Sequence, residues 1–173
     1  MPYSAGENRS FVRDFVVENK IGSVLDVGPG AGMYADMFSD LPFALKRIDA
    51  IEIWEPYIDR FNLQSKYDLT IVGDVRDNIT WETGKWDLII FGDVLEHMTE
   101  DEALSVWTKA SYVADWGLIS VPIIHYPQGE AEGNPYERHV QEDLNPQKIE
   151  ELFGPFNRKE LYSETGTFIK RFA

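Results

Sequence analysis

The stretch Val24–Gly32, VLDVGPGAG, decides how the rest of the chain is interpreted. An apolar run with an acid near its end is typical of a buried strand, and glycine then occupies every second position, at Gly28, Gly30 and Gly32. Glycine lets the backbone adopt angles that other residues avoid, and it lets a ligand touch the main chain. A helix that starts beyond such a loop adds free N–H groups. The stretch therefore predicts a strand, a ligand-binding loop and a helix, in that order.

Length and composition favour one soluble domain. The chain has 173 residues, with 43% hydrophobic and 27% charged residues, which suits a single globular domain over residues 1–173. Its apolar runs are far shorter than the roughly 20 residues that a membrane span needs, so we expect a cytoplasmic protein without a membrane partner. The absence of cysteine excludes disulfides, thiolate metal sites and cysteine nucleophiles.

The charge balance argues against nucleic acid as a partner. The chain has 30 acidic against 16 basic residues, a formal charge of −14, and no basic cluster. Nucleic-acid binding depends on many phosphate-neutralising side chains, so we expect no such partner. The acidic excess favours solubility, with an acidic docking surface as the alternative. The oligomeric state stays open, a homodimer included.

Helical and strand periodicities alternate along the chain. We expect helices at about 7–20, 33–38, from 56, 99–112 and 145–153, and strands at 23–27, 47–53, 69–74, 86–93 and 117–122, followed by two strands around a turn at 164–166. Thr99 and Glu102 form a predicted capping box, and Leu104 and Trp107 are expected to face inward. This alternation predicts a doubly wound, Rossmann-like α/β fold.

Acidic residues follow the predicted strands at the edge where ligands bind in such sheets. Glu52 ends the second strand, where it can accept both hydroxyls of a ribose, and Asp74 ends the third, within reach of an adenine amino group. The alternative for each acid is a helix cap or a solvated loop residue. The dinucleotide pattern G-x-G-x-x-G fails because Met33 stands at its last position, and the looser register from Gly30 leaves Asp26 without a role.

With these motifs, residues 10–173 resemble the class I S-adenosylmethionine-dependent methyltransferases. VLDVGPGAG resembles that family's first motif, IEIWEPY its second-strand acid, GDVRD its adenine contact, and WDLIIFGDVLEHM the fourth-strand motif of its small-molecule branch. The resemblance implies a three-layer αβα sandwich whose seven-stranded sheet has the order 3-2-1-4-5-7-6, with strand seven antiparallel. The cofactor residues that it implies are Asp26, Gly28, Gly30, Gly32, Glu52, Ile53, Trp54, Asp74, Val75, Phe91, Gly92 and Asp93.

The resemblance assigns a role to each group. The three glycines would line the methionyl part, Asp26 would hold its amino group, and Glu52 would bind the ribose. Ile53 and Trp54 would flank the adenine, Asp74 and Val75 would meet its edge, and residues 91–93 would close the far wall. We therefore expect a methyltransferase that uses S-adenosylmethionine and a small polar acceptor, methylated at oxygen or nitrogen.

Two other functions remain open on the sequence. A non-catalytic module could keep the cofactor pocket, and an NAD-dependent oxidoreductase could share the architecture, although no Tyr-x-x-x-Lys pair follows the fourth strand. The Asn/Asp-Pro-Pro-aromatic signature is absent as well, because Gly92-Asp93-Val94-Leu95 stands in its place. We therefore expect neither adenine nor an amide nitrogen as the acceptor.

Histidines are the candidates for a general base. In methyl transfer, a general base contributes less to the rate than holding the reacting atoms in line does. His97 is the first choice because it follows the fourth strand, with a structural helix-start residue as the alternative; His125 and His139 could also face the acceptor. Their spacing matches no local ligand motif, so we expect no metal site. Residues 123–142 are predicted to form a lid with hinges at Gly129 and Gly133, or else a passive surface loop.

Overall fold

A seven-stranded sheet forms the centre of the computed structural model, which describes residues 6–77, 81 and 84–172. The ends of the predicted domain, 1–5 and 173, lie outside the described residues. Along the chain the strands are β1 (Ser23–Val27), β2 (Arg47–Glu52), β3 (Leu69–Val72), β4 (Trp86–Gly92), β5 (Ala114–Pro122), β6 (Arg158–Leu161) and β7 (Thr165–Arg171). Their order is β3-β2-β1-β4-β5-β7-β6. The first five strands pair in parallel and β7 is antiparallel to both neighbours, which confirms the predicted topology.

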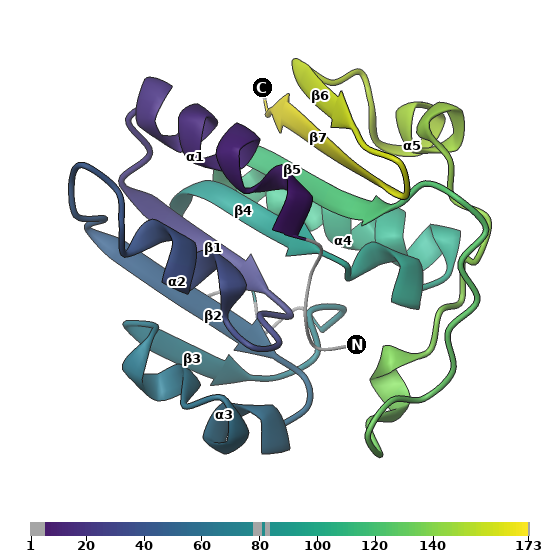
Figure 1. Ribbon diagram of the computed structural model, residues 1–173, viewed down its shortest axis with the longest axis horizontal. Coiled ribbons are helices and arrows are strands. Elements are labelled where there is room, and N and C mark those ends of the chain that lie inside the picture. Colours follow the sequence, from purple (N-terminus) through teal and green to yellow (C-terminus); the bar gives the residue numbers. More distant parts are fainter. Residues whose placement is uncertain (1–5, 78–80, 82–83, 173) are drawn as a thin grey trace.

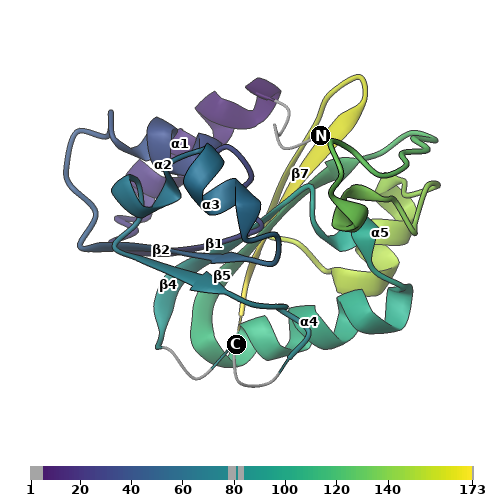
Figure 2. The same ribbon diagram turned by 90° about the horizontal axis from the view of Figure 1, so that it is seen from below.

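Helices cover both faces of the sheet, so the molecule has three layers. The α-helices are α1 (Arg9–Glu18), α2 (Met33–Phe38), α3 (Pro56–Arg60), α4 (Glu100–Val113) and α5 (Pro146–Phe153), with short 3-10 turns η1 (Gly6–Asn8), η2 (Leu63–Ser65), η4 (Leu95–His97) and η5 (Pro135–Glu137). Figures 1 and 2 show α1, α2 and α3 on one face and α4 and α5 on the other. No helix among the described residues is long and apolar enough to cross a membrane.

The central strand β4 is apolar on both faces because it is covered on both. Successive side chains of a strand point to opposite faces, so Leu88 and Ile90 pack with the core under α1, while Ile89 and Phe91 pack with the core under α4. All four side chains are buried. The continuous apolar run in the sequence therefore follows from the strand's place in the middle layer.

Two details of the α4 and C-terminal regions differ from the prediction. Leu104 is 40% exposed, whereas Trp107 is buried, because α4 packs on the sheet through Ala103, Val106 and Trp107. The predicted Thr99–Glu102 capping box is present. The last turn lies before Thr165 rather than at 164–166, because β7 starts there and pairs along β5 as far as Pro122.

The order of the strands places the loop after β1 at the point where the chain reverses direction across the sheet. Strand β1 lies between β2 and β4, so the connection from β1 turns one way and the connection from β3 to β4 crosses to the other side. Ligands of open α/β sheets bind in the crevice outside the carboxyl ends of the strands at such a switch point. Figure 1 shows residues 123–144 passing beyond the arrowheads of β1 and β4, at the same edge.

Candidate cofactor and acceptor site

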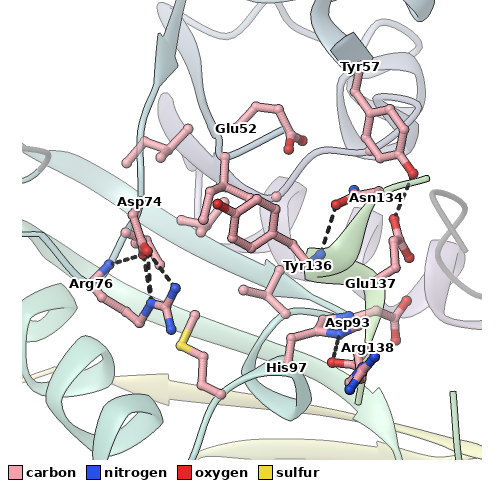
Figure 3. Close-up of a pocket in the computed structure, with 18 of the residues that line it drawn as sticks. Glu52, Tyr57, Asp74, Arg76, Asp93, His97, Asn134, Tyr136, Glu137 and Arg138 are labelled. Atoms are coloured by element: carbon pink, nitrogen blue, oxygen red, sulfur yellow. Dashed lines mark hydrogen bonds and ion pairs between the residues drawn. The ribbon is translucent and has the colours of Figure 1, made fainter. Parts of the chain in front are cut away.

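A pocket lies at this edge, and residues from five regions of the chain form its wall. It is lined by Val27, Gly28, Gly30, Ile51, Glu52, Ile53, Tyr57, Gly73, Asp74, Val75, Arg76, Gly92, Asp93, Val94, His97, Met98, Asn134, Pro135, Tyr136, Glu137, Arg138 and Val140. Figure 3 shows Glu52 and Asp74 on one side and His97 with Arg138 on the other. The structure thus brings together eight of the predicted cofactor residues and one of the three histidines: Gly28, Gly30, Glu52, Ile53, Asp74, Val75, Gly92, Asp93 and His97.

The glycine loop presents bare backbone to this pocket. Gly28 and Gly30 have φ angles of 63° and 51°, in the left-handed region that side chains disfavour. A Cβ atom added to Gly28 would lie 2.7 Å from Cγ2 of Val94, which also lines the pocket. Gly32 caps α2 and does not line the pocket. The loop therefore needs glycine both for its backbone angles and for the space beside it.

Glu52 carries a buried carboxylate at the end of β2. It is 3% exposed, lines the pocket, and accepts a hydrogen bond from the backbone N–H of Trp54 over 2.7 Å. Burial raises the pKa of Glu52 to about 7. Ile53 also lines the pocket, whereas Trp54 lies outside its wall, with its ring centroid 6.2 Å from that of Tyr136.

Asp26 and Phe91 lie behind the wall rather than in it. Asp26 is buried and accepts a hydrogen bond from the hydroxyl of Tyr67 over 2.6 Å, and burial raises its pKa to about 7. The side chain of Phe91 packs against Trp107 in the core, with ring centroids 6.0 Å apart, so the expectation that Phe91 closes the far wall is wrong for its side chain. It points to the α4 face because it alternates with Ile90 along β4.

Asp74 is held by a neighbouring arginine. The guanidinium of Arg76 contacts both carboxylate oxygens of Asp74 at 2.6 to 2.9 Å, and it also reaches Glu102 at 3.1 Å. Partial burial alone would raise the pKa of Asp74, but the hydrogen bonds and charge of Arg76 lower it overall. The side chain is therefore an ionised acceptor with a fixed orientation at the pocket wall.

The three predicted histidines have different surroundings. His97 lines the pocket and its Nδ1 lies 3.0 Å from the carbonyl oxygen of Arg138, while burial lowers its pKa. His139 is buried behind it, with the two ring centroids 4.8 Å apart. His125 has a side chain that is 63% exposed and pairs with Asp143 over 2.7 Å, outside the pocket wall, so the structure does not support the expectation that it faces the acceptor.

Segment 123–142 supplies the remaining wall. The sequence predicted this segment as a lid but did not predict which of its residues line the pocket. Asn134, Tyr136, Glu137 and Arg138 all line the pocket, and the hydroxyl of Tyr57 donates to Oε1 of Glu137 over 3.0 Å. Tyr136 and Arg138 were not among the predicted site residues, although their place in the predicted lid is a signal that could have found them. Tyr57 and Arg76 carried no such signal, because a helix-face tyrosine and a loop arginine are common without any ligand.

The donor set fits an adenosyl sulfonium compound. Gly28 and Gly30, which line the pocket, have no Cβ to occlude it, and the wall carries a buried carboxylate and a second, ionised one. Carboxylates suit ribose hydroxyls, an amino group and a positive sulfur, and no phosphate-binding G-K-[ST] follows the glycines. These features match the cofactor that the sequence implied.

Comparison with known proteins gives the family. The family model described as "Methyltransferase domain" matches residues 25–111, which is half of the chain. No curated protein sequence matches the chain.

Solved structures share the fold at low sequence identity. A S-adenosylmethionine-dependent methyltransferase from Clostridium acetobutylicum is 15% identical, with a TM-score of 0.69 over 95% of this chain and 90% of its own. Magnesium protoporphyrin IX methyltransferase from Synechocystis, with S-adenosylhomocysteine bound, is 16% identical, with a TM-score of 0.66 over 94% and 81%. The N-terminal domain of EvdMO1, also with S-adenosylhomocysteine bound, is 14% identical, with a TM-score of 0.68 over 98% and 83%.

The topology of the sheet, the pocket at its switch point and the matching family model agree with one another. The chain belongs to the class I S-adenosylmethionine-dependent methyltransferases, and its cofactor is S-adenosylmethionine.

Proposed function

We propose that the protein transfers a methyl group from S-adenosylmethionine to an oxygen or nitrogen atom of a small polar acceptor. One observation supports this above all: a single pocket is lined by Glu52 and the glycine loop on one side and by His97 and segment 123–142 on the other. A cofactor at the first part and an acceptor at the second would lie next to each other in one cavity. S-adenosylmethionine supplies an already activated methyl group on a positive sulfur.

At the cofactor end, each residue has a role that its surroundings support. Gly28 and Gly30 leave room for the methionyl part, and Glu52, held by the Trp54 N–H, can accept hydrogen bonds from the ribose hydroxyls. Ile53 and Val75 offer apolar surface for the adenine, beside the carboxylate of Asp74. Asp26 would act through the loop that follows β1, because its side chain lies behind the pocket wall.

At the acceptor end, the polar side chains of the wall favour a small polar molecule. Six residues between Asn134 and Val140, all except His139, form part of the wall, which supports the interpretation of this segment as a lid. Their side chains offer an amide, a phenol, a carboxylate and a guanidinium, all of which can hydrogen-bond a polar acceptor. The net charge of −14 continues to argue against a nucleic acid.

His97 is the candidate base at this end. Its Nδ1 faces a carbonyl oxygen, which can only accept a hydrogen bond, so that nitrogen carries the proton and Nε2 keeps a lone pair in the neutral ring. The lowered pKa keeps the ring neutral at neutral pH. Orientation supplies more of the rate than a base does, about 7–11 kcal/mol against about 3–5 kcal/mol, so the proposal does not depend on His97.

A transfer assay on a natural mixture tests the proposal without a known acceptor. The protein is incubated with methyl-tritiated S-adenosylmethionine and a total cell extract, and the labelled products are separated by size. We expect label in the fraction of small molecules with the wild-type chain and with Glu55→Ala, and its loss with Glu52→Ala. Glu55 is an exposed neighbour that makes no capping hydrogen bond and lies outside the pocket wall. Label confined to macromolecules, or equal labelling by Glu52→Ala, would contradict the proposal.

A further inference from the structure

Glu96, His97 and His139 form a cluster at the acceptor end of the pocket that methyl transfer does not by itself explain. One ligand atom from each side chain, a carboxylate oxygen or a ring nitrogen, lies within 4.8 Å of the other two. Glu96 and His97 belong to η4, whereas His139 comes from segment 123–142. The sequence did not predict this cluster because the two histidines are far apart in the chain.

The carboxyl group of Glu96 lacks any protein partner that would explain its burial. Glu96 is 1% exposed, and neither Oε1 nor Oε2 accepts a hydrogen bond from the residues that the structure describes. Burying a carboxyl without a partner is costly, and buried charges are as a rule paired or bound to metals. The surroundings of Glu96 therefore favour a positive ion beside it.

Both histidines are oriented as metal ligands are. Nδ1 of His97 lies 3.0 Å from the carbonyl oxygen of Arg138, and Nδ1 of His139 lies 2.7 Å from that of Tyr126. A carbonyl oxygen accepts only, so each Nδ1 donates and each Nε2 is left with its lone pair. Metal-binding histidines almost always donate their second ring N–H in this way. Figure 3 shows His97 fixed against the backbone of Arg138 at the pocket wall.

Backbone hydrogen bonds hold the two parts of the cluster together. The carbonyl oxygen of Glu96 accepts from the N–H groups of Val140 and Gln141, each over 2.9 Å. The side-chain amide of Gln141 also donates to the carbonyl oxygen of Leu95 over 3.0 Å. The guanidinium of Arg138 is paired with Glu130 at 3.1 Å, so its charge is directed to another carboxylate. The cluster is thus built before any ion arrives.

We propose that Glu96, His97 and His139 bind one divalent cation of the zinc type, with an open coordination position toward the pocket. Two imidazoles and a carboxylate are a donor set of catalytic zinc sites, which keep their fourth position for water or substrate. Magnesium prefers oxygen donors, so the two nitrogens argue against it. The metal would use the Nε2 lone pair of His97, and His97 would then be a ligand rather than a free base.

The place of the ion suggests what it does. His97 lines the pocket, so an oxygen of the acceptor can take the open position and be held there. This role rests on the proposed function, whereas metal binding itself does not. An acceptor with a hydroxyl or carboxylate group is the substrate class that it favours.

Metal binding is measured on the whole chain after chelator treatment and dialysis. Zn²⁺ is added by equilibrium dialysis and the bound metal is determined by mass spectrometry, with Mg²⁺ in a parallel series. We expect about one Zn²⁺ per chain, little Mg²⁺, and a loss of affinity of more than tenfold in His139→Ala and in His97→Ala. The matched control is His125→Ala, which removes an exposed histidine outside the pocket wall and should bind Zn²⁺ as the wild type does.

Circular dichroism and S-adenosylmethionine binding are recorded for each variant, so that a misfolded variant is recognised. If one of the two histidine variants misfolds, the other one decides the test. A wild-type chain that binds no Zn²⁺ would overturn the proposal, as would a folded His139→Ala chain with unchanged affinity. Either result would leave cofactor binding, and with it the proposed function, untouched. A wild-type chain that binds Zn²⁺ but does not bind S-adenosylmethionine would contradict the proposed function and leave the metal site standing.

Discussion

The hydroxyl of Tyr67 donates a hydrogen bond to Oδ2 of Asp26 over 2.6 Å, and both side chains are buried. Tyr67 follows η2 and Asp26 lies in β1, so this bond ties the α3 region to the strand that precedes the glycine loop. A buried carboxyl that loses its partner keeps the cost of its burial. The bond therefore stabilises the loop through the strand behind it.

Replacing Tyr67 with phenylalanine should lower the free energy of unfolding by about 1–3 kcal/mol, because it leaves the Asp26 carboxyl without its hydroxyl donor. Urea denaturation followed by fluorescence measures the change. Tyr112→Phe is the matched control, since Tyr112 is 74% exposed and its change should stay within about 0.5 kcal/mol. Equal stabilities of the two variants would show that the bond contributes nothing.

The backbone angle of Gly28 leads to a second prediction, on the stability and cofactor binding of Gly28→Ala. Alanine there should cost about 1–2 kcal/mol in a left-handed conformation, and its Cβ would also meet Val94 at 2.7 Å. We expect a lower melting temperature and weaker S-adenosylmethionine binding, measured by calorimetry. Gly129→Ala is the control, because nothing lies within 4 Å of the added atom. The account of the loop is wrong if Gly28→Ala binds the cofactor as well as Gly129→Ala does.

The raised pKa of Glu52, about 7 through burial, predicts how stability depends on pH. The folded chain holds a proton on Glu52 between about pH 4 and pH 7 that the unfolded chain releases. The stabilisation that comes from protonated Glu52 is therefore fully present below the ordinary pKa of glutamate, and it is lost as the pH rises through about 7. Without cofactor, stability should fall between pH 5 and pH 7.5.

Glu52→Gln isolates this effect, because glutamine does not titrate. The fall in the free energy of unfolding between pH 5 and pH 7.5 should be smaller in this variant than in the wild type, by up to about 3 kcal/mol. Denaturation curves at the two pH values measure it. An identical fall in both chains would show that Glu52 titrates normally.

The bond between Tyr57 and Glu137 makes a prediction for segment 123–142. Tyr57→Phe removes one contact that holds the segment to α3, so the amides of residues 134–138 should exchange hydrogen faster. Hydrogen exchange with mass spectrometry measures the difference. Tyr162→Phe is a control, because the Tyr162 hydroxyl has no hydrogen-bond partner among the described residues. Unchanged exchange in Tyr57→Phe would mean that other contacts fix the segment.

The alternating pattern of the sequence predicted most helices and strands and the doubly wound class, whereas the order of the strands was predicted from the family resemblance. The apolar run of β4 was readable because the strand is covered on both faces, and the capping box was readable because Thr99 and Glu102 form it within one helical turn. Leu104 was misplaced because helical spacing alone does not say which part of a helix meets the sheet. The start of β7 was missed because pairing with β5 sets it rather than the nearby glycine.

The part of the site at the carboxyl ends of the parallel strands was predictable. Gly28, Glu52 and Asp74 lie at or just after the ends of β1, β2 and β3, so the topology of a parallel sheet brings them to one edge. His139 approaches His97 through a long segment whose path no periodicity describes. Tyr57 and Arg76 were also not predicted in the pocket wall, because tertiary packing decides where their side chains point.

Calorimetric titration with S-adenosylmethionine tests the central claim most directly, in the wild type, Glu52→Ala and Glu55→Ala. We predict micromolar binding by the wild type and by Glu55→Ala, and an affinity at least tenfold lower for Glu52→Ala, because removing a charged contact to two hydroxyls costs about 1.5–3 kcal/mol. Equal binding by all three chains, or preferential binding of NADH, would contradict the account.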